Sequence, residues 1–137
     1  ALYGERCISR RVGQIFIESA LNNKEIIISG DGDEKLDFTY IDDLVQGFEK
    51  RITSKKSKNE IFNITYGSAR SINEMTKVLK NDFPDIVIKN EKRDKLTPVR
   101  GTLSIKKAKD LLGYNPKWSL ENGYPKYIKW YKDIFKH

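Results

Sequence analysis

The chain has 137 residues, of which 38% are hydrophobic and 11% aromatic, so it can form one packed domain and is not a disordered chain. Its formal net charge of +7 is compatible with nucleic acid, an anionic membrane or a phosphorylated small molecule, and equally with a lysine-rich solvated surface. One cysteine excludes an internal disulfide, one cysteine with one histidine excludes a zinc cluster, and no apolar run reaches the roughly 18 residues of a membrane span, so we expect a cytoplasmic protein with no metal site.

The first part of the chain predicts a helix followed by two extended segments. Apolar residues recur at helical spacing over 11–21, with Ser9 as the expected N-cap. Three consecutive isoleucines predict a short buried strand over 25–29. Residues 30–35 are rich in Gly and Asp and predict a turn, and residues 36–41 predict a second extended segment.

The middle of the chain predicts two helices separated by a strand. Asp42 or Asp43 is the expected N-cap of the first helix. Residues 60–65 (EIFNIT) predict a strand after a polar, lysine-rich loop. Ser71 and Glu74 have the spacing of a capping box and predict the start of the second helix.

The last third of the chain predicts one more strand and two helices. Residues 86–88 are the strand candidate. Ser104 is the expected cap of a short helix that ends before Gly113, and Ser119 opens the last helix. Pro125 lies inside that last pattern, so its first turn is expected to be irregular or the regular helix to begin later. Strands alternate with helices, which indicates an α/β fold.

The stretch GDGDEKLDFTYIDD at 30–43 has the Asp and Gly residues of a calcium loop. A calcium-binding EF-hand loop starting at Asp31 would need Gly at its sixth position and Glu at its twelfth, and these positions are Leu36 and Asp42. We therefore interpret this stretch as a turn between extended segments.

The residues on their own do not identify a reaction. No Ser/His/Asp or Cys/His arrangement can be built, since His137 is the only histidine and is the last residue. Neither the dinucleotide G-x-G-x-x-G nor the phosphate-binding G-x-x-x-x-G-K-[ST] occurs. Arg10 and Arg11 could meet phosphate at the start of the first helix or lie in solvent, whereas the lysine runs at 50–58 and 89–95 are interpreted as solvated surface.

Several segments occur in a fixed order: LYG at 2–4, FIESALNNKEIIISGDG at 16–32, LDFTYIDDL at 36–44, IFNITYG at 61–67, SINE at 71–74, RGTLSIKKAKDLLGY at 100–114 and WY at 130–131. In the same order, they resemble segments of one family. The first three resemble its V-Y-G-P segment, its helix, strand and G-D-G turn, and its R-D-F-x-Y-V-D-D segment. The others resemble V-F-N-I-G-x-G, the S-I-N-E that follows it, D-x-S-K-A-x-x-x-L-G-Y-x-P and the closing W-Y. This family is the extended short-chain dehydrogenase/reductases, the NAD-dependent nucleotide-sugar epimerases and dehydratases of carbohydrate metabolism and polysaccharide biosynthesis.

The resemblance implies that residues 1–137 are the C-terminal, nucleotide-sugar-binding portion of a Rossmann-type enzyme. The glycine-rich cofactor loop and the catalytic Tyr-x-x-x-Lys of the family would lie upstream, since neither is present and no Lys follows Tyr3 at the required spacing. NAD or NADP would then be bound by the full-length enzyme and not by this chain, which would be inactive alone. The resemblance also allows a homodimer of the full-length enzyme. Because helices of the family pack against that other half, exposed apolar side chains are expected on the helix over 42–52.

The resemblance also implies substrate contacts, with no catalytic, cofactor or metal residue among them. These contacts fall on Arg11, Val12, Ile27, Ser29, Lys35, Asn63 and Arg100, with Arg93 and Lys95 as further candidates for the diphosphate. Leu36 stands where the R-D-F motif has Arg, and Lys35 could replace that charge only from an irregular backbone, because neighbours in a strand face opposite ways. Ser29 stands where many members have an aromatic residue. The alternatives are a basic nucleic-acid-binding α/β module, which we do not favour, and a non-catalytic scaffold.

Overall fold

The computed structural model describes residues 1–96 and 98–135, so His137 lies outside the described residues. Its elements are β1 (Leu2–Tyr3), α1 (Val12–Leu21), β2 (Ile26–Ser29), β3 (Lys35–Leu36), β4 (Thr39–Tyr40), α2 (Ile41–Thr53), the 3₁₀ turn η1 (Lys55–Ser57), β5 (Arg70–Ser71), α3 (Ile72–Lys80), β6 (Ile88–Glu91), α4 (Lys106–Leu112) and α5 (Leu120–Ile134). Strand β1 pairs in parallel with β4 and β2 with β6, whereas β3 and β5 are antiparallel. Parallel strands joined through helices confirm the α/β prediction. In this described part, no helix has the length and apolar character that crossing a membrane requires.

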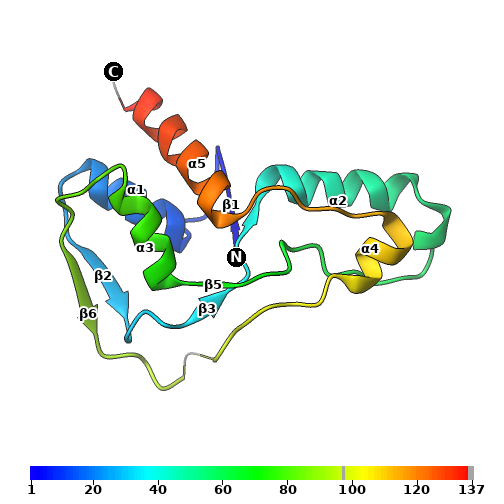
Figure 1. The fold of residues 1–137 in the computed structure, drawn as a ribbon, viewed down its shortest axis with the longest axis horizontal. Helices are drawn as coiled ribbons and strands as arrows, with labels where there is room; N and C mark the ends of the chain where they lie inside the picture. Colours follow the sequence, from blue (N-terminus) through cyan, green and yellow to red (C-terminus); the bar gives the residue numbers. More distant parts are fainter. Residues whose placement is uncertain (97, 136–137) are drawn as a thin grey trace.

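The main apolar core lies among α1, α3, α5 and the strands beside them (Figure 1). Tyr3 of β1 is its aromatic centre, with ring centroids 5.4 Å from Tyr40, 6.1 Å from Tyr124 and 6.3 Å from Tyr127. Helix α5 can approach β1 this closely because Gly123 has no side chain: a Cβ there would lie 2.4 Å from the Tyr3 hydroxyl. Aromatic pairs at these distances add to the stability that burial of the rings provides.

Helices α2 and α4 extend away from that core (Figure 1). A second, smaller cluster lies beneath them, made by Ile105, Ala108, Leu112 and Tyr114 with Phe62 and Ile64 packed against it. The opposite face of α2 carries Val45, Phe48 and Ile52, which are 56%, 58% and 82% exposed. The predicted exposure of apolar side chains on this helix is confirmed.

Local signals located the helices but misplaced several caps. The capping box is confirmed, because the Ser71 hydroxyl accepts from the Glu74 N–H while the Glu74 carboxylate accepts from the Ser71 N–H. Gly113 has φ +64° and ends α4 as expected. Helix α5 begins at Leu120 with Ser119 as its N-cap position, so the predicted start is confirmed, and it contains Pro125 in its interior, so the alternative of a later start was wrong.

Three predicted N-caps were wrong. The N-cap positions are Arg11 for α1, Tyr40 for α2 and Ile105 for α4, in place of Ser9, Asp42 or Asp43, and Ser104. In α2 both aspartates lie in the first turn, where a negative charge favours the helix, but neither caps it with its side chain.

The strand predicted over 60–65 does not form. Thr65 accepts a hydrogen bond at its carbonyl from the Tyr114 hydroxyl, and the N–H of Tyr66 donates to the Thr39 hydroxyl. At the end of this segment, side chains from distant parts of the chain therefore take the place of a neighbouring strand. The strand predicted at 86–88 is displaced to Ile88–Glu91. The strand predicted from the three isoleucines forms as β2, but only its alternate residues are buried, since Ile27 is 44% exposed.

Asp43 fixes the chain that leads from α4 to α5. Its side chain is 1% exposed, and its carboxylate accepts from the backbone N–H groups of Lys117 at 2.7 Å and Trp118 at 2.9 Å. A buried carboxylate is stable only when its oxygens are hydrogen-bonded in this way. The helix α2 is thereby attached to a segment more than 70 residues away in the sequence.

We expect Asp43→Ala to lower the free energy of unfolding by about 3 kcal/mol, because the variant loses a buried, charged acceptor that binds two backbone N–H groups. The neighbouring Asp42 is the matched control: its side chain is 52% exposed and pairs with Lys126 at 3.1 Å, so Asp42→Ala should cost about 0.5 kcal/mol. Chemical denaturation of the purified protein measures both changes. Equal losses in the two variants would contradict this role of Asp43.

Candidate functional site

A cavity of about 780 Å³ lies between the start of α1, strand β3 and residues 99–103. Its volume is within the range of small-molecule sites, roughly 300–1,000 Å³. The floor is apolar and is formed by Val12, Leu36, Phe38 and Met75. A cavity with this floor can hold an organic ligand, while the groups at its edge decide which kind.

The edge of the cavity is basic. Three exposed arginines line it: Arg10, Arg11 and Arg100. Arg11 is the N-cap residue of α1, whose first turn has no acidic residue. The N–H groups at the start of a helix and cationic side chains both favour an anion, so this edge suits a phosphate or carboxylate.

Arg11 and Arg100 come from segments that are far apart in the sequence, and both line this cavity. Arg11 is oriented by a hydrogen bond from its Nε to the Ser9 hydroxyl at 3.2 Å. Arg11 and Arg100 therefore place positive charge around a common region of the cavity.

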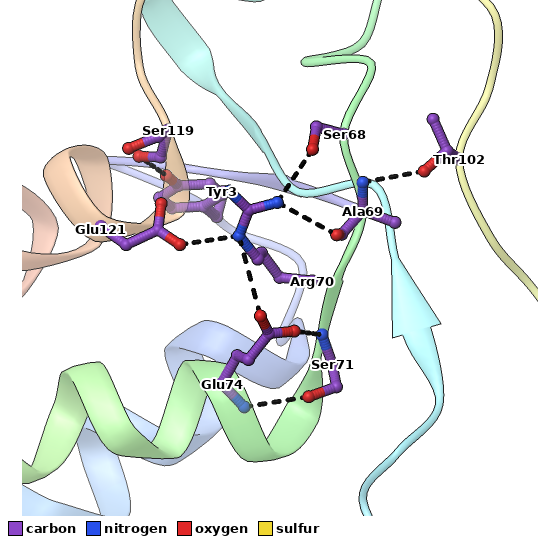
Figure 2. Close-up of polar contacts among 9 residues, drawn as sticks. All are labelled: Tyr3, Ser68, Ala69, Arg70, Ser71, Glu74, Thr102, Ser119 and Glu121. Carbon is purple, nitrogen blue, oxygen red and sulfur yellow. Dashed lines mark hydrogen bonds and ion pairs between the residues drawn. The ribbon is translucent and has the colours of Figure 1, made fainter.

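Asp37 lies in the cavity wall and joins the segments that form it. One carboxylate oxygen accepts from the Gly67 N–H at 3.1 Å and the other from the Leu103 N–H at 3.2 Å. The Ala69 N–H also donates to the Thr102 hydroxyl at 2.9 Å (Figure 2). The wall is thus fixed by backbone hydrogen bonds, and the one acidic side chain that lines the cavity is already engaged by the protein.

The structure brings together three of the seven predicted contact residues in this cavity. Arg11, Val12 and Arg100 line it. Lys35 lines an adjoining pocket of about 350 Å³ together with Arg93 and Arg100. Lys35 is exposed and Leu36 buried, which confirms that the two neighbours face opposite ways.

The other predicted residues do not line the larger cavity. Ile27 and Ser29 are on the exposed face of β2, in register with Lys89 and Glu91 of β6. Asn63 is exposed, and its amide donates to the Ser104 carbonyl at 3.0 Å. Any contact of these side chains with a ligand remains a prediction.

The Gly-Asp turn at 30–33 is held by the start of α3. The Asn73 amide donates to the Asp31 carbonyl at 3.1 Å and to the Asp33 carboxylate at 2.9 Å, and Asp31 accepts from the Asp33 N–H. A Cβ at Gly32 would lie 2.2 Å from Asn73 Oδ1, so the turn requires glycine. The described residues contain no group of three or more acidic, His or Cys side chains that could hold a metal.

Arg70 of β5 lies opposite a residue that lines the cavity. It is opposite Leu36 in the β3–β5 pair, and its guanidinium lies between Glu121 of α5, at 2.7 Å, and Glu74 of α3, at 3.9 Å (Figure 2). Partial burial would raise the pKa of Glu121, but hydrogen bonds from Arg70, from its own backbone and from Ser119 together hold it below the ordinary value. Leu36, in the floor, is therefore paired with a residue that two helices fix in place.

Sequence reasoning missed Thr65, which also lines the cavity. A signal was present, since Thr65 falls on the first Gly of the V-F-N-I-G-x-G motif. A threonine in place of glycine adds a hydroxyl and a methyl group to the wall.

Comparisons with known proteins agree with this architecture. Residues 1–65 match the model of the NAD dependent epimerase/dehydratase family. The chain is 36% identical over 125 residues to a UDP-glucuronate 4-epimerase of Thermodesulfobacterium geofontis, covering 86% of the chain and 36% of that protein. It is 31% identical to UDP-glucuronic acid decarboxylase 2 of Arabidopsis thaliana, covering 93% of the chain and 29% of that protein.

A solved structure shows the same relationship. The UDP-glucuronic acid 4-epimerase of Bacillus cereus, in complex with UDP-glucuronic acid and NAD, superposes with a TM-score of 0.89 at 29% identity, over 98% of this chain and 43% of that one. The chain therefore spans less than half the length of the relatives it matches.

We expect Arg70→Met to destabilise the protein more at pH 7 than at pH 3. The lowered pKa of Glu121 contributes stability above its unfolded-state value near 4.5, and this contribution is lost as the pH falls through the folded-state pKa. Thermal unfolding at both pH values measures the difference between variant and parent, with Lys77→Met, an exposed residue of α3, as the control of equal charge change. The same loss at pH 3 and pH 7 would contradict the proposed pairing.

Proposed function

We propose that this chain, which is related by sequence and fold to the NAD-dependent epimerase/dehydratase family, binds the nucleotide-sugar of such an enzyme in the cavity between α1, β3 and residues 99–103. The observation that carries the proposal is the arrangement of Arg11 and Arg100 at the edge of that cavity, beside the start of a helix. A diphosphate there would meet cationic side chains and helix N–H groups together.

Each part of the cavity has a role in this proposal. Arg11 and Arg100 bind the diphosphate, whereas Arg10, which also lines the cavity, is paired with Glu18 at 3.6 Å. Val12 and the apolar floor exclude water beneath the ligand. Fixing the diphosphate orients the sugar, and orientation can supply a large share of a rate enhancement.

The missing Arg of the R-D-F motif is compensated, in this proposal, from other segments. Leu36 contributes only apolar surface to the floor. The positive charge comes from Arg11 and Arg100, with Lys35 restricted to the adjoining pocket. No irregular backbone at Lys35 is then required.

The residues of this chain do not fit NAD. A dinucleotide pyrophosphate is normally held by a glycine-rich turn that lets backbone approach it closely, and the sequence contains neither that turn nor a Tyr-x-x-x-Lys. In the proposal, NAD binding and hydride transfer belong to a part of the enzyme outside these residues, and we derive no step through the cofactor.

The exposed face of α2 is compatible with such a further part. Val45, Phe48 and Ile52 form an apolar stripe along the helix, and an exposed stripe of this kind marks an interaction surface. In the proposal, this face packs against the cofactor-binding half.

Nucleic acid is a weaker candidate ligand. Several lysines are engaged with acidic side chains: Lys89 pairs with Glu25 at 2.6 Å and Lys107 with Glu60 at 2.5 Å. These lysines are locally neutralised and do not form a continuous basic track. Tight, steeply salt-dependent binding of single- or double-stranded nucleic acid would instead favour that function.

We expect UDP to bind the purified protein, and Arg11→Gln and Arg100→Gln each to weaken that binding by about tenfold, the effect of losing one charge-assisted hydrogen bond. Lys56→Gln in η1, outside the cavity, removes the same charge and should leave affinity within about twofold. Isothermal titration calorimetry measures all four proteins. Equal weakening by all three substitutions would show that only net charge matters and would contradict the proposed site.

We expect the 137-residue chain to show no turnover of UDP-, dTDP-, GDP- or CDP-sugars when NAD is added, because the residues for hydride transfer are not in it. Chromatography of the sugar products measures this. Turnover by the isolated chain would sink the assignment to substrate binding alone.

A further inference from the structure

We infer that Thr65 is a specificity-determining residue of the cavity, and that its hydroxyl donates a hydrogen bond to a phosphate oxygen of the bound ligand. The inference rests on the proposed function, since it concerns the same cavity. It assigns a contact to a position at which the motif V-F-N-I-G-x-G has glycine and hence no side chain.

The backbone around Thr65 is held on both sides. The Thr65 carbonyl accepts from the Tyr114 hydroxyl at 2.9 Å, and the next N–H, that of Tyr66, donates to the Thr39 hydroxyl at 3.2 Å. The Gly67 N–H is bound by Asp37 at 3.1 Å. The position of the Thr65 Cα is therefore fixed before any ligand arrives, which is what a preorganised contact needs.

The side chain of Thr65 contrasts with that backbone. Its hydroxyl is buried and has no hydrogen-bond partner among the described residues. A buried hydroxyl without a partner is unfavourable, and most such groups in folded proteins are hydrogen-bonded. Nearby polar side chains are engaged: the Asn63 amide donates to Ser104, and the Thr39 hydroxyl accepts from Tyr66.

The inference requires a rotation about χ1 that turns the hydroxyl into the cavity. Thr65 lines the cavity, and its hydroxyl and methyl groups occupy neighbouring staggered positions on the same Cβ. Exchange of these positions would turn the hydroxyl toward the interior when an acceptor is present there. The cations Arg11 and Arg100 line the same cavity, so the acceptor they select is an anionic oxygen.

A purely structural threonine would behave differently. If Thr65 served only to fill space in an extended segment, valine would replace it without loss, since the two side chains have nearly the same shape. The apo protein should then be unchanged or more stable, because valine removes an unpaired buried hydroxyl. Only a ligand contact predicts that the same substitution also weakens binding.

The test compares Thr65→Val with Thr65→Ser, which keeps the hydroxyl and loses the methyl group. We expect Thr65→Val to weaken binding of both UDP and inorganic pyrophosphate by about tenfold while its Tm without ligand is equal to or above that of the parent. Thr65→Ser should stay within about twofold of the parent affinity for each probe. Calorimetric titration and thermal unfolding of the purified proteins give the two readouts.

Each other outcome overturns the inference in a distinguishable way. Unchanged UDP affinity in Thr65→Val overturns it while the proposed function stands. Weaker binding accompanied by a lower Tm shows a structural role, and loss of UDP but not pyrophosphate affinity excludes the phosphate contact. If the parent protein binds neither probe, the proposed function fails and the inference fails with it.

Discussion

The hydrogen bonds that Asp37 accepts from Gly67 and Leu103 hold three distant segments around one space. Strand β3, the loop after residue 64 and the chain before α4 have few regular strand contacts of their own, since β3 is only two residues long. A buried carboxylate with two backbone donors can replace the missing ladder because each such bond is charge-assisted. The cavity exists because these segments meet at Asp37.

The same principle operates at Asp43, which attaches α2 to the segment before α5. Both aspartates belong to the stretch LDFTYIDDL, so one short run of sequence organises both the cavity and the α2–α4 extension. The acidic residues that resemble a calcium loop are, in the folded chain, acceptors for the protein's own N–H groups. The positive charge for an anionic ligand comes from other segments, where Arg11 and Arg100 line the cavity.

Features set by neighbouring residues could be predicted from the sequence, and features set by distant partners could not. The capping box at Ser71 and the left-handed Gly113 depend only on local spacing, and both were found. The segment 60–65 has the composition of a strand, yet the Thr65 carbonyl and the following N–H of Tyr66 are bound by Tyr114 and Thr39, which no local pattern reveals. The candidate site shows the same division: Arg11 and Arg100, both named from motif matching, line one cavity, whereas a threonine at a glycine position, which also lines it, was given no role.

The proposed binding of a nucleotide-sugar depends on Arg11 and Arg100 contacting the same diphosphate. A crystal structure of the protein grown with UDP is the most direct measurement of this claim. We predict the diphosphate within hydrogen-bond distance of both guanidinium groups, over the floor formed by Val12 and Leu36. UDP bound outside this cavity, or within it without contact to either arginine, would contradict the account.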